Sequence, residues 1–193
     1  MKILFEGYSC IGQNRAGGVS IKAKNLKTNL EENGFSVKYF DKWRDKISDC
    51  DILHIFMASS DVFNIVKYAK SINVPVVVSS IVPISRGLTI MYNRILSKIF
   101  HLRTVWKLNG DVLALADAVL AESELEKKHI CRYYRINPDK IKVIPNGIYA
   151  KANTIDKSLF YEKTGISGKF VLQVGRFDSN KNQLSTIRAV KNT

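Results

Sequence analysis

The chain has 193 residues and a formal net charge of +13 at pH 7, from 30 lysines and arginines against 17 aspartates and glutamates. This length fits one full domain plus part of a second, and a hydrophobic content of 46% fits a globular protein with a sizeable core. The charge indicates a polyanionic partner: nucleic acid, an anionic membrane or a phosphorylated substrate.

The three cysteines, Cys10, Cys50 and Cys131, are odd in number and far apart. None has Cys-x-x-Cys or metal-ligand spacing, so we expect reduced thiols and a cytoplasmic protein. An acid at Glu6 follows the first apolar residues, which predicts a strand there rather than a signal peptide. No apolar run has the length that a membrane-spanning helix needs.

The first strand is expected at residues 3–5, and a loop leads from it to Gly17 and Gly18, at the start of a helix over residues 19–33. A Gly-Gly pair at a helix N-terminus exposes unpaired backbone N–H groups beside the positive end of the helix dipole, which suits an anion. The same pair is also common in ordinary turns. The sequence has neither Gly-x-Gly-x-x-Gly nor the Gly-Lys-[Ser/Thr] of a P-loop, which argues against a dehydrogenase and a nucleoside triphosphatase.

The next part of the chain alternates between strand and helix patterns. His54 falls inside one of the apolar strands, where a histidine is most often a hydrogen-bonded core residue. Further along, Ser123 and Glu126 form a capping box at the start of a helix. This alternation without an internal repeat predicts a doubly wound α/β fold with a mostly parallel sheet. Strands are expected at residues 35–40, 51–56, 74–80, 119–121 and 141–144, and helices at 62–72, 88–108 and 123–134.

The helix expected over residues 88–108 combines an apolar stripe with cations. No Asp or Glu occurs between Val62 and Gly110. The pattern favours a helix that lies in the interface of an anionic bilayer. It also suits the core-facing side of a helix that covers the sheet. The stripe consists of Leu88, Met91, Tyr92, Ile95, Ile99, Leu102 and Trp106, and the residues expected to face the membrane are Arg94, Lys98, Arg103, Trp106 and Lys107.

Two apolar runs near the C-terminus stop abruptly at turn residues. Residues 142–144 end at Pro-Asn-Gly, and residues 170–174 end at Gly175 and Arg176. In an open α/β sheet, ligands bind in the loops at the carboxyl ends of the strands. Gly175 lets a backbone approach closely, and Arg176 with Lys181 offers a guanidinium fork and an ammonium, which suits a diphosphate. Both cations also fit a solvated loop.

The stretch V-I-P-N-G-I at residues 143–148, followed by V-L-Q-V-G-R-F-D-S-N-K-N at 171–182, resembles the family 4 glycosyltransferases of GT-B fold. The resemblance covers essentially all of this chain but only the front half of a typical member. It implies an N-terminal, acceptor-side Rossmann-like domain at 1–149 and a connection at 150–168. Residues 169–193 would then supply the first strand and helix of a C-terminal, donor-binding Rossmann-like domain.

The resemblance also implies a reaction, which is transfer of a sugar from a nucleotide-sugar donor with retention of configuration. The acceptor would be lipid-linked or a polysaccharide or lipopolysaccharide precursor, on the inner face of the cell membrane, and neither a metal nor another cofactor is expected. The family's glutamate pair would lie beyond Thr193, so we expect this chain alone to be inactive. The donor-binding residues implied are Gly17, Gly18, Asn146, Gly147, Gly175, Arg176 and Lys181.

The acceptor side departs from the family pattern. Members carry a histidine near the active cleft on the strand that holds His54 here, but a second family histidine falls at Ile81. Ser80 and Ser85 are the nearby polar residues, so His54 and Ser80 remain as catalytic candidates. An alternative function is a non-catalytic module that binds an acceptor or a membrane. No zinc-finger spacing, aromatic RNA-binding pattern or homeodomain-type helix supports a nucleic-acid binder.

Overall fold

The computed structural model describes residues 1–7, 11, 17–147, 158–166, 168–177 and 181–191, without the side chain of Ser85. The chain divides into two compact units, Met1–Ile148 and Tyr149–Thr193, and each is described by itself. Cys50 and Cys131 are free thiols, and Cys10 lies outside the described residues.

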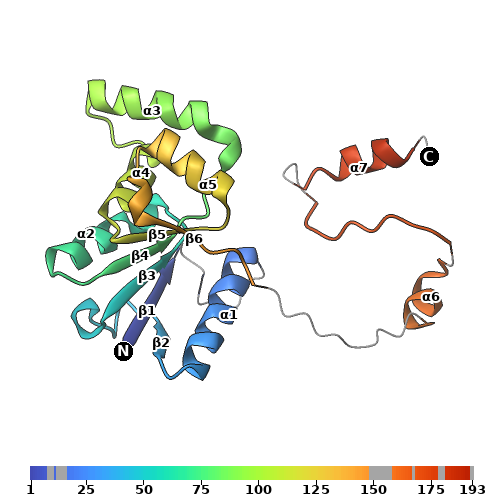
Figure 1. Ribbon diagram of the computed structural model, residues 1–193, viewed down its shortest axis with the longest axis horizontal. Helices are drawn as coiled ribbons and strands as arrows, with labels where there is room; N and C mark the ends of the chain where they lie inside the picture. Colours follow the sequence, from blue (N-terminus) through green and yellow to red (C-terminus); the bar gives the residue numbers. More distant parts are fainter. Residues whose placement is uncertain (8–10, 12–16, 148–157, 167, 178–180, 192–193) are drawn as a thin grey trace. The chain divides into compact units, whose positions relative to one another are not determined.

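The first unit is built on a parallel sheet of six strands, counted over the described residues, in the order β2-β1-β3-β4-β5-β6 (Figure 1). Every neighbouring pair is parallel, which is the arrangement of short buried apolar strands separated by helices. The predicted doubly wound α/β class is therefore confirmed. The strands are β1 (Lys2–Gly7), β2 (Ser36–Tyr39), β3 (Ile52–Phe56), β4 (Val76–Ser79), β5 (Ala118–Ala121) and β6 (Ile141–Val143).

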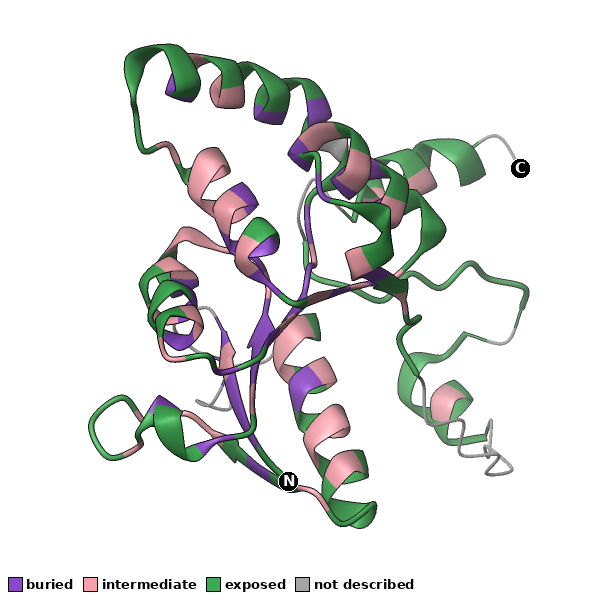
Figure 2. Ribbon diagram, turned by 60° about the vertical axis from the view of Figure 1, so that its left-hand side comes forward, coloured by how far each residue is buried: buried purple, intermediate pink, exposed green. Residues whose placement is uncertain are grey.

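Helices pack on both faces of this sheet. They are α1 (Gly18–Glu32), α2 (Phe63–Ser71), α4 (Val105–Leu115) and α5 (Glu124–His129), which continues as a π-helix over Ile130–Tyr134. A further helix, α3 (Gly87–Phe100), packs mainly on α4 and on the π-helix. Alternate strand residues face opposite ways, so Ile3 and Phe5 pack with α1 while Leu4 joins the larger core on the other face. Figure 2 shows the strands buried at the centre and α3 largely exposed.

Short 3-10 turns complete the first unit. The connection from β2 to β3 holds one such turn and no α-helix, so part of the sheet beside α2 lacks a covering helix. This gap matters below, because it opens a pocket. The turns are η1 (Ile47–Asp49), η2 (Ser60–Val62), η3 (Ile84–Arg86) and η5 (Pro138–Lys140).

The prediction of one continuous helix over residues 88–108 is wrong, because the structure has two helices there, α3 and α4. His101 ends α3 in the left-handed conformation, with φ 54°. Thr104 then caps α4, since its hydroxyl accepts a hydrogen bond from the Lys107 N–H and lies 3.0 Å from the Ser97 hydroxyl. A cap made inside an apolar stripe leaves the helical spacing of that stripe unchanged, and the sequence pattern therefore did not reveal the break.

The second unit contains α6 (Ser158–Thr164) and α7 (Gln183–Val190). The prediction of a strand at residues 170–174 is wrong, since none of these described residues forms a strand. The side chains of Val171 and Val174 are 67% and 85% exposed. A single strand has no neighbour to receive its backbone hydrogen bonds. Among the contacts that this segment makes is a stack of the Phe160 and Phe170 rings, with centroids 5.1 Å apart.

Candidate functional site at the carboxyl edge of the sheet

The carboxyl ends of the parallel strands lie at one edge of the sheet, where open α/β folds bind their ligands. The start of α1 belongs to this edge because it follows β1. Gly17 and Gly18 are exposed there, and a side chain added to either would meet no atom within 4 Å. Among the residues that the structure describes, neither a side-chain cap nor an acid in the first turn occupies this helix start. The first backbone N–H groups of α1 therefore remain open to an anion.

His54 lies on β3 and faces α1, with 6% of its surface exposed. Its ring stacks on Phe56 with centroids 4.4 Å apart, and its Nε2 lies 3.0 Å from the Ser79 Oγ. Burial, with a smaller contribution from the charge of Lys22, lowers the pKa of His54 to about 3. The imidazole is therefore neutral at physiological pH and packed within the sheet.

This burial predicts a pH-dependent loss of stability. Below pH 6.5 the unfolded chain binds a proton at His54 that the folded chain does not, so stability falls as the pH falls. The loss from this group between pH 7 and pH 5 is about 2 kcal/mol. Urea unfolding at both pH values should show a smaller difference in His54→Gln than in the wild type. His101→Gln, at an exposed position, serves as the control and should keep the full difference. An equal pH dependence in wild type and His54→Gln would contradict the prediction.

Ser80 and Glu126 form a buried network after β4. The Ser80 hydroxyl donates to Glu126 Oε1 at 2.8 Å, and the Val82 N–H donates to the same oxygen at 3.0 Å. The Glu122 N–H donates to Glu126 Oε2 at 2.6 Å. Glu126 is 4% exposed, so one buried carboxylate ties the loop after β4 to the end of β5.

Ile81 lies between Ser80 and Val82 with φ 44°. A β-branched residue rarely adopts this left-handed conformation, which costs on the order of 1–3 kcal/mol and persists only where the surroundings enforce it. The hydrogen bonds from both neighbours of Ile81 to Glu126 supply that enforcement. At this position, where the resemblance described above leads us to expect a histidine, the chain carries a strained, half-buried isoleucine.

A second polar network joins α1, β5 and the segment after β6. The Lys22 Nζ lies 2.9 Å from Glu122 Oε1, and the Asn146 side chain also hydrogen bonds to Glu122. Burial raises the pKa of Glu122, but the hydrogen bonds from Lys22 and Asn146 outweigh it and hold that pKa below its usual range. Glu122 is therefore an ionised carboxylate, and Asn146 lies at the same edge as the start of α1.

The residues expected to bind a diphosphate, Gly175, Arg176 and Lys181, belong to the second unit. A side chain at Gly175 would come within 3.4 Å of the Lys181 stem, so the loop places these two residues in contact. Gln173 donates to the Lys181 carbonyl and Gln183 to the Arg176 carbonyl, each at 2.6 Å. The ends of the loop are thus tied together beside the start of α7.

The cations expected to face a membrane divide into two groups. Arg94 is turned inward, where its Nη1 donates to the Tyr134 carbonyl at 2.6 Å, and Lys107 pairs with Asp111 at 2.6 Å. Lys98 and Arg103 are exposed, and the Arg103 guanidinium carbon lies 6.0 Å from the Phe63 ring centroid.

Trp106 lies on α4, packs partly against the core, and has the Arg86 guanidinium carbon 6.0 Å from its ring centroid. It does not continue the exposed stripe of α3, because the chain bends between the two helices. Gly147 is exposed at the end of the first unit.

Sequence reasoning missed Lys22 and Glu122, and recognised Glu126 only as a helix cap. One signal was present, since Glu122 comes directly after the expected strand at 119–121 of a strongly basic chain, and Glu126 follows one helical turn later. Over the part of the chain that the structure describes, no group of three or more His, Cys, Asp or Glu residues could hold a metal ion. None of the helices described has both the length and the apolar character to cross a bilayer.

Residues 19–151 match the model of Glycosyltransferase Family 4. No curated protein sequence matches the chain. The crystal structure of Anabaena Alr3699/HepE in complex with UDP is similar in fold, with a TM-score of 0.56 at 15% sequence identity. That match covers 86% of this chain and 50% of the Anabaena chain, so the present chain spans half the length of that protein.

Proposed function

Because the chain belongs to glycosyltransferase family 4, we propose that it takes part in sugar transfer from a nucleotide-sugar donor to a glycan or lipid-linked acceptor, with retention of configuration. The observation that carries the proposal is the gathering of the open start of α1, Glu122 and Asn146 at one edge of the sheet. That edge offers backbone N–H groups to an anion and a carboxylate to hydroxyl donors.

The donor diphosphate is assigned to the N–H groups of Gly175 and Arg176 and to the cations Arg176 and Lys181. A departing nucleoside diphosphate gains negative charge in the transition state, and fixed cations stabilise that charge. UDP, which the Anabaena protein binds, is the first nucleotide to test. No metal or other cofactor is part of this proposal.

Arg176→Ala and Lys181→Ala should each weaken binding of UDP to the chain by about 10- to 100-fold. This factor corresponds to the free energy that one hydrogen bond to a charged group contributes. Where transfer is measurable, each variant should lose on the order of 2–4 kcal/mol of transition-state stabilisation. Titration calorimetry measures the first effect and turnover of a nucleotide-sugar the second. Arg188→Ala, an exposed arginine of α7 in the same unit, is the matched control and should bind UDP as the wild type does.

UDP affinity that survives both substitutions would return Arg176 and Lys181 to the role of solvated loop residues. Turnover by the 193-residue chain would overturn the expectation that it is inactive by itself. Binding of an acceptor glycan with no affinity for any nucleotide-sugar would favour the alternative, a non-catalytic binding module.

We also propose that α3 binds the surface of an anionic membrane on its cytoplasmic face. Its buried residues are Gly87, Ile90 and Ser97, so a narrow stripe of small residues and one isoleucine packs inward. The wide apolar stripe faces outward instead, the reverse of an ordinary amphipathic packing helix. Its members Leu88, Met91, Tyr92, Ile95 and Ile99 are 72%, 45%, 62%, 51% and 61% exposed.

Charge selects an anionic lipid surface as the partner of this stripe. Lys98 and Arg103 are exposed at its flank and end, and no acid occurs between Val62 and Gly110. Each cation near an anionic bilayer contributes about 1 kcal/mol to binding, and the apolar side chains add the energy of leaving water. Acids would be expected on a helix face that only meets solvent.

A further inference from the structure

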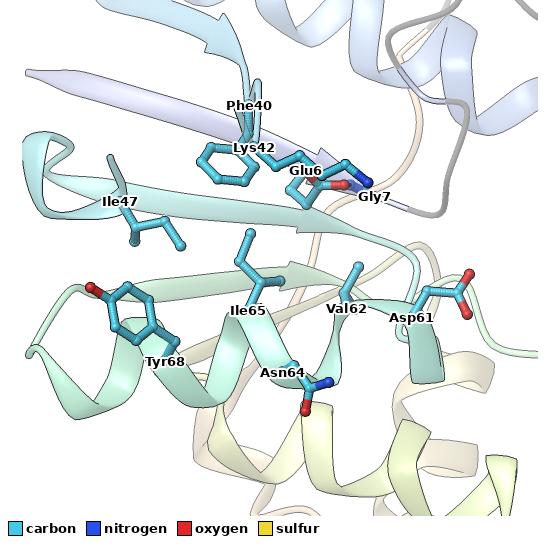
Figure 3. A pocket seen from close by; sticks show the side chains of 10 residues that line it. All are labelled: Glu6, Gly7, Phe40, Lys42, Ile47, Asp61, Val62, Asn64, Ile65 and Tyr68. Carbon is cyan, nitrogen blue, oxygen red and sulfur yellow. The ribbon is translucent and has the colours of Figure 1, made fainter. Parts of the chain in front are cut away.

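A pocket of about 460 Å³ lies on the face of the sheet opposite α1, since Val62, one of its lining residues, belongs to the core cluster of Leu4 and not to that of α1. Figure 3 shows the side chains that line it. It is lined from β1, from the connection after β2, and from η2 and α2. We call it the α2 groove. It exists because the β2–β3 connection carries no α-helix, so the helix that would normally cover this strip of a doubly wound sheet is missing.

The α2 groove has a carboxylate at a position where the fold calls for an apolar side chain. Glu6 follows Leu4 by two residues on β1 and so points to the same face, and Leu4 is part of the core there. Its carboxylate accepts a hydrogen bond from its own neighbour, the Gly7 N–H, at 3.0 Å. Burial raises the pKa of Glu6, against smaller opposing effects of that hydrogen bond and of Lys42.

A half-buried carboxylate in such a position lowers stability unless further donors reach it. Residues that break the pattern of a fold in this way concentrate at functional sites. A ligand that donates hydrogen bonds to Glu6 would satisfy this carboxylate.

The walls of the α2 groove define the rest of that ligand. Figure 3 shows Glu6 and Lys42 together above Ile65, with Tyr68 at one end and Asp61 at the other. Phe40 and Tyr68 give it aromatic surfaces, so the ligand needs apolar faces as well as hydroxyl donors. The lining has two acidic residues, Glu6 and Asp61, and one basic residue, Lys42, so its net charge is −1. This charge disfavours an acidic ligand.

We propose that the α2 groove is a binding site for a neutral saccharide. A pyranose ring has both required features, since its axial C–H groups form apolar faces and its equatorial hydroxyls donate in pairs to a carboxylate. Glu6 accepts from two neighbouring hydroxyls, Lys42 donates to a ring or hydroxyl oxygen, and Tyr68 packs against the ring. This site goes beyond the proposed function, because binding here does not depend on sugar transfer or on the donor.

The test is saturation-transfer NMR of the 193-residue chain with methyl glucopyranoside, galactopyranoside, mannopyranoside and N-acetylglucosaminide at millimolar concentration. At least one neutral glycoside should bind, and the matching methyl glucuronide should bind more weakly at pH 7. Glu6→Gln should lower the affinity for the bound glycoside about 10-fold or more, because a charged acceptor is lost while the size is kept. Tyr68→Ala should lower it as well.

Matched controls separate a binding role from a structural one. Glu32→Gln on α1 and Tyr161→Ala on α6 change exposed residues of the same types and should bind as the wild type does. Glu6→Gln should unfold at the same or a higher urea concentration, since it removes a buried charge that the fold does not need. No binding by any glycoside, or affinity unchanged in both groove variants, overturns the proposal. A loss shared with the control variants, or stronger binding of the glucuronide, overturns it too.

Discussion

Replacing Leu88, Ile95 and Ile99 together by glutamine is expected to abolish binding of the chain to anionic vesicles. These side chains are 72%, 51% and 61% exposed, so the substitutions leave the core of the first unit untouched. The apolar surface that would leave water on membrane binding is worth roughly 3–5 kcal/mol for the three residues, or about 100- to 5,000-fold in the partition coefficient. Co-sedimentation with phosphatidylserine-containing vesicles measures the partition coefficients of the wild type and the triple variant.

A second variant tests the charge part of the same surface. Lys98→Gln with Arg103→Gln should weaken binding to anionic vesicles by about 30-fold, at about 1 kcal/mol for each cation, and change binding to neutral vesicles little. Arg94 and Lys107 are left unchanged because their side chains bond to Tyr134 and Asp111 within the protein. Ile21→Gln, at a 57% exposed isoleucine of α1, is the control for the apolar substitutions. If the wild type binds neither anionic nor neutral vesicles, α3 has no membrane role. The same conclusion follows if the triple glutamine variant binds anionic vesicles as strongly as the wild type.

Removal of the Glu126 carboxylate is expected to be among the most destabilising single substitutions in the first unit. Glu126→Ala leaves the Ser80 hydroxyl and the N–H groups of Val82 and Glu122 without the acceptor that they share. The free energy of unfolding should fall by about 3–5 kcal/mol, a large part of the stability of an ordinary domain. Urea unfolding followed by circular dichroism measures this loss.

Glu124→Ala is the matched control for Glu126→Ala, because Glu124 is exposed on the same helix and its loss should cost under about 1 kcal/mol. Hydrogen exchange adds a local measurement. The amides of Val82 and Glu122 should exchange faster in Glu126→Gln, whose amide group replaces one acceptor oxygen by a donor. Equal stability of the Glu126→Ala and Glu124→Ala variants would show that the network around Ile81 does not depend on this carboxylate.

Much of the first unit was predictable from local pattern. Short apolar runs ended by turn residues locate β3, β4 and β6 to within a few residues, since a strand covered on both faces needs apolar side chains throughout. The cap of α5 was equally readable, because the Ser123 hydroxyl accepts from the Glu126 N–H three residues on. The other half of the expected capping box differs, because the Glu126 carboxylate bonds to Ser80 and two other backbone amides instead.

The candidate site was only partly predictable. Gly17, Gly18 and Asn146 follow strands in sequence, and parallel strands bring such loops to one edge. The partners of Glu122 and Glu126 were not readable, because Lys22 is 100 residues from Glu122 and Ser80 is 46 residues from Glu126. Such pairings depend on how the sheet is ordered, and hydrophobic periodicity carries no information on that order.

The sequence by itself determined the class of fold, because the alternation of buried strands and helices is a local property of the chain. Only the tertiary structure decided which side of α3 faces outward. Periodicity shows an apolar stripe on that helix but not the direction in which it faces. Contacts set the inward side, because a side chain at Gly87 would overlap the Tyr133 ring. Small residues let α3 approach its neighbours closely there, and the apolar stripe is left exposed. Residues 170–174 show the converse, since an apolar run becomes a strand only when another strand pairs with it.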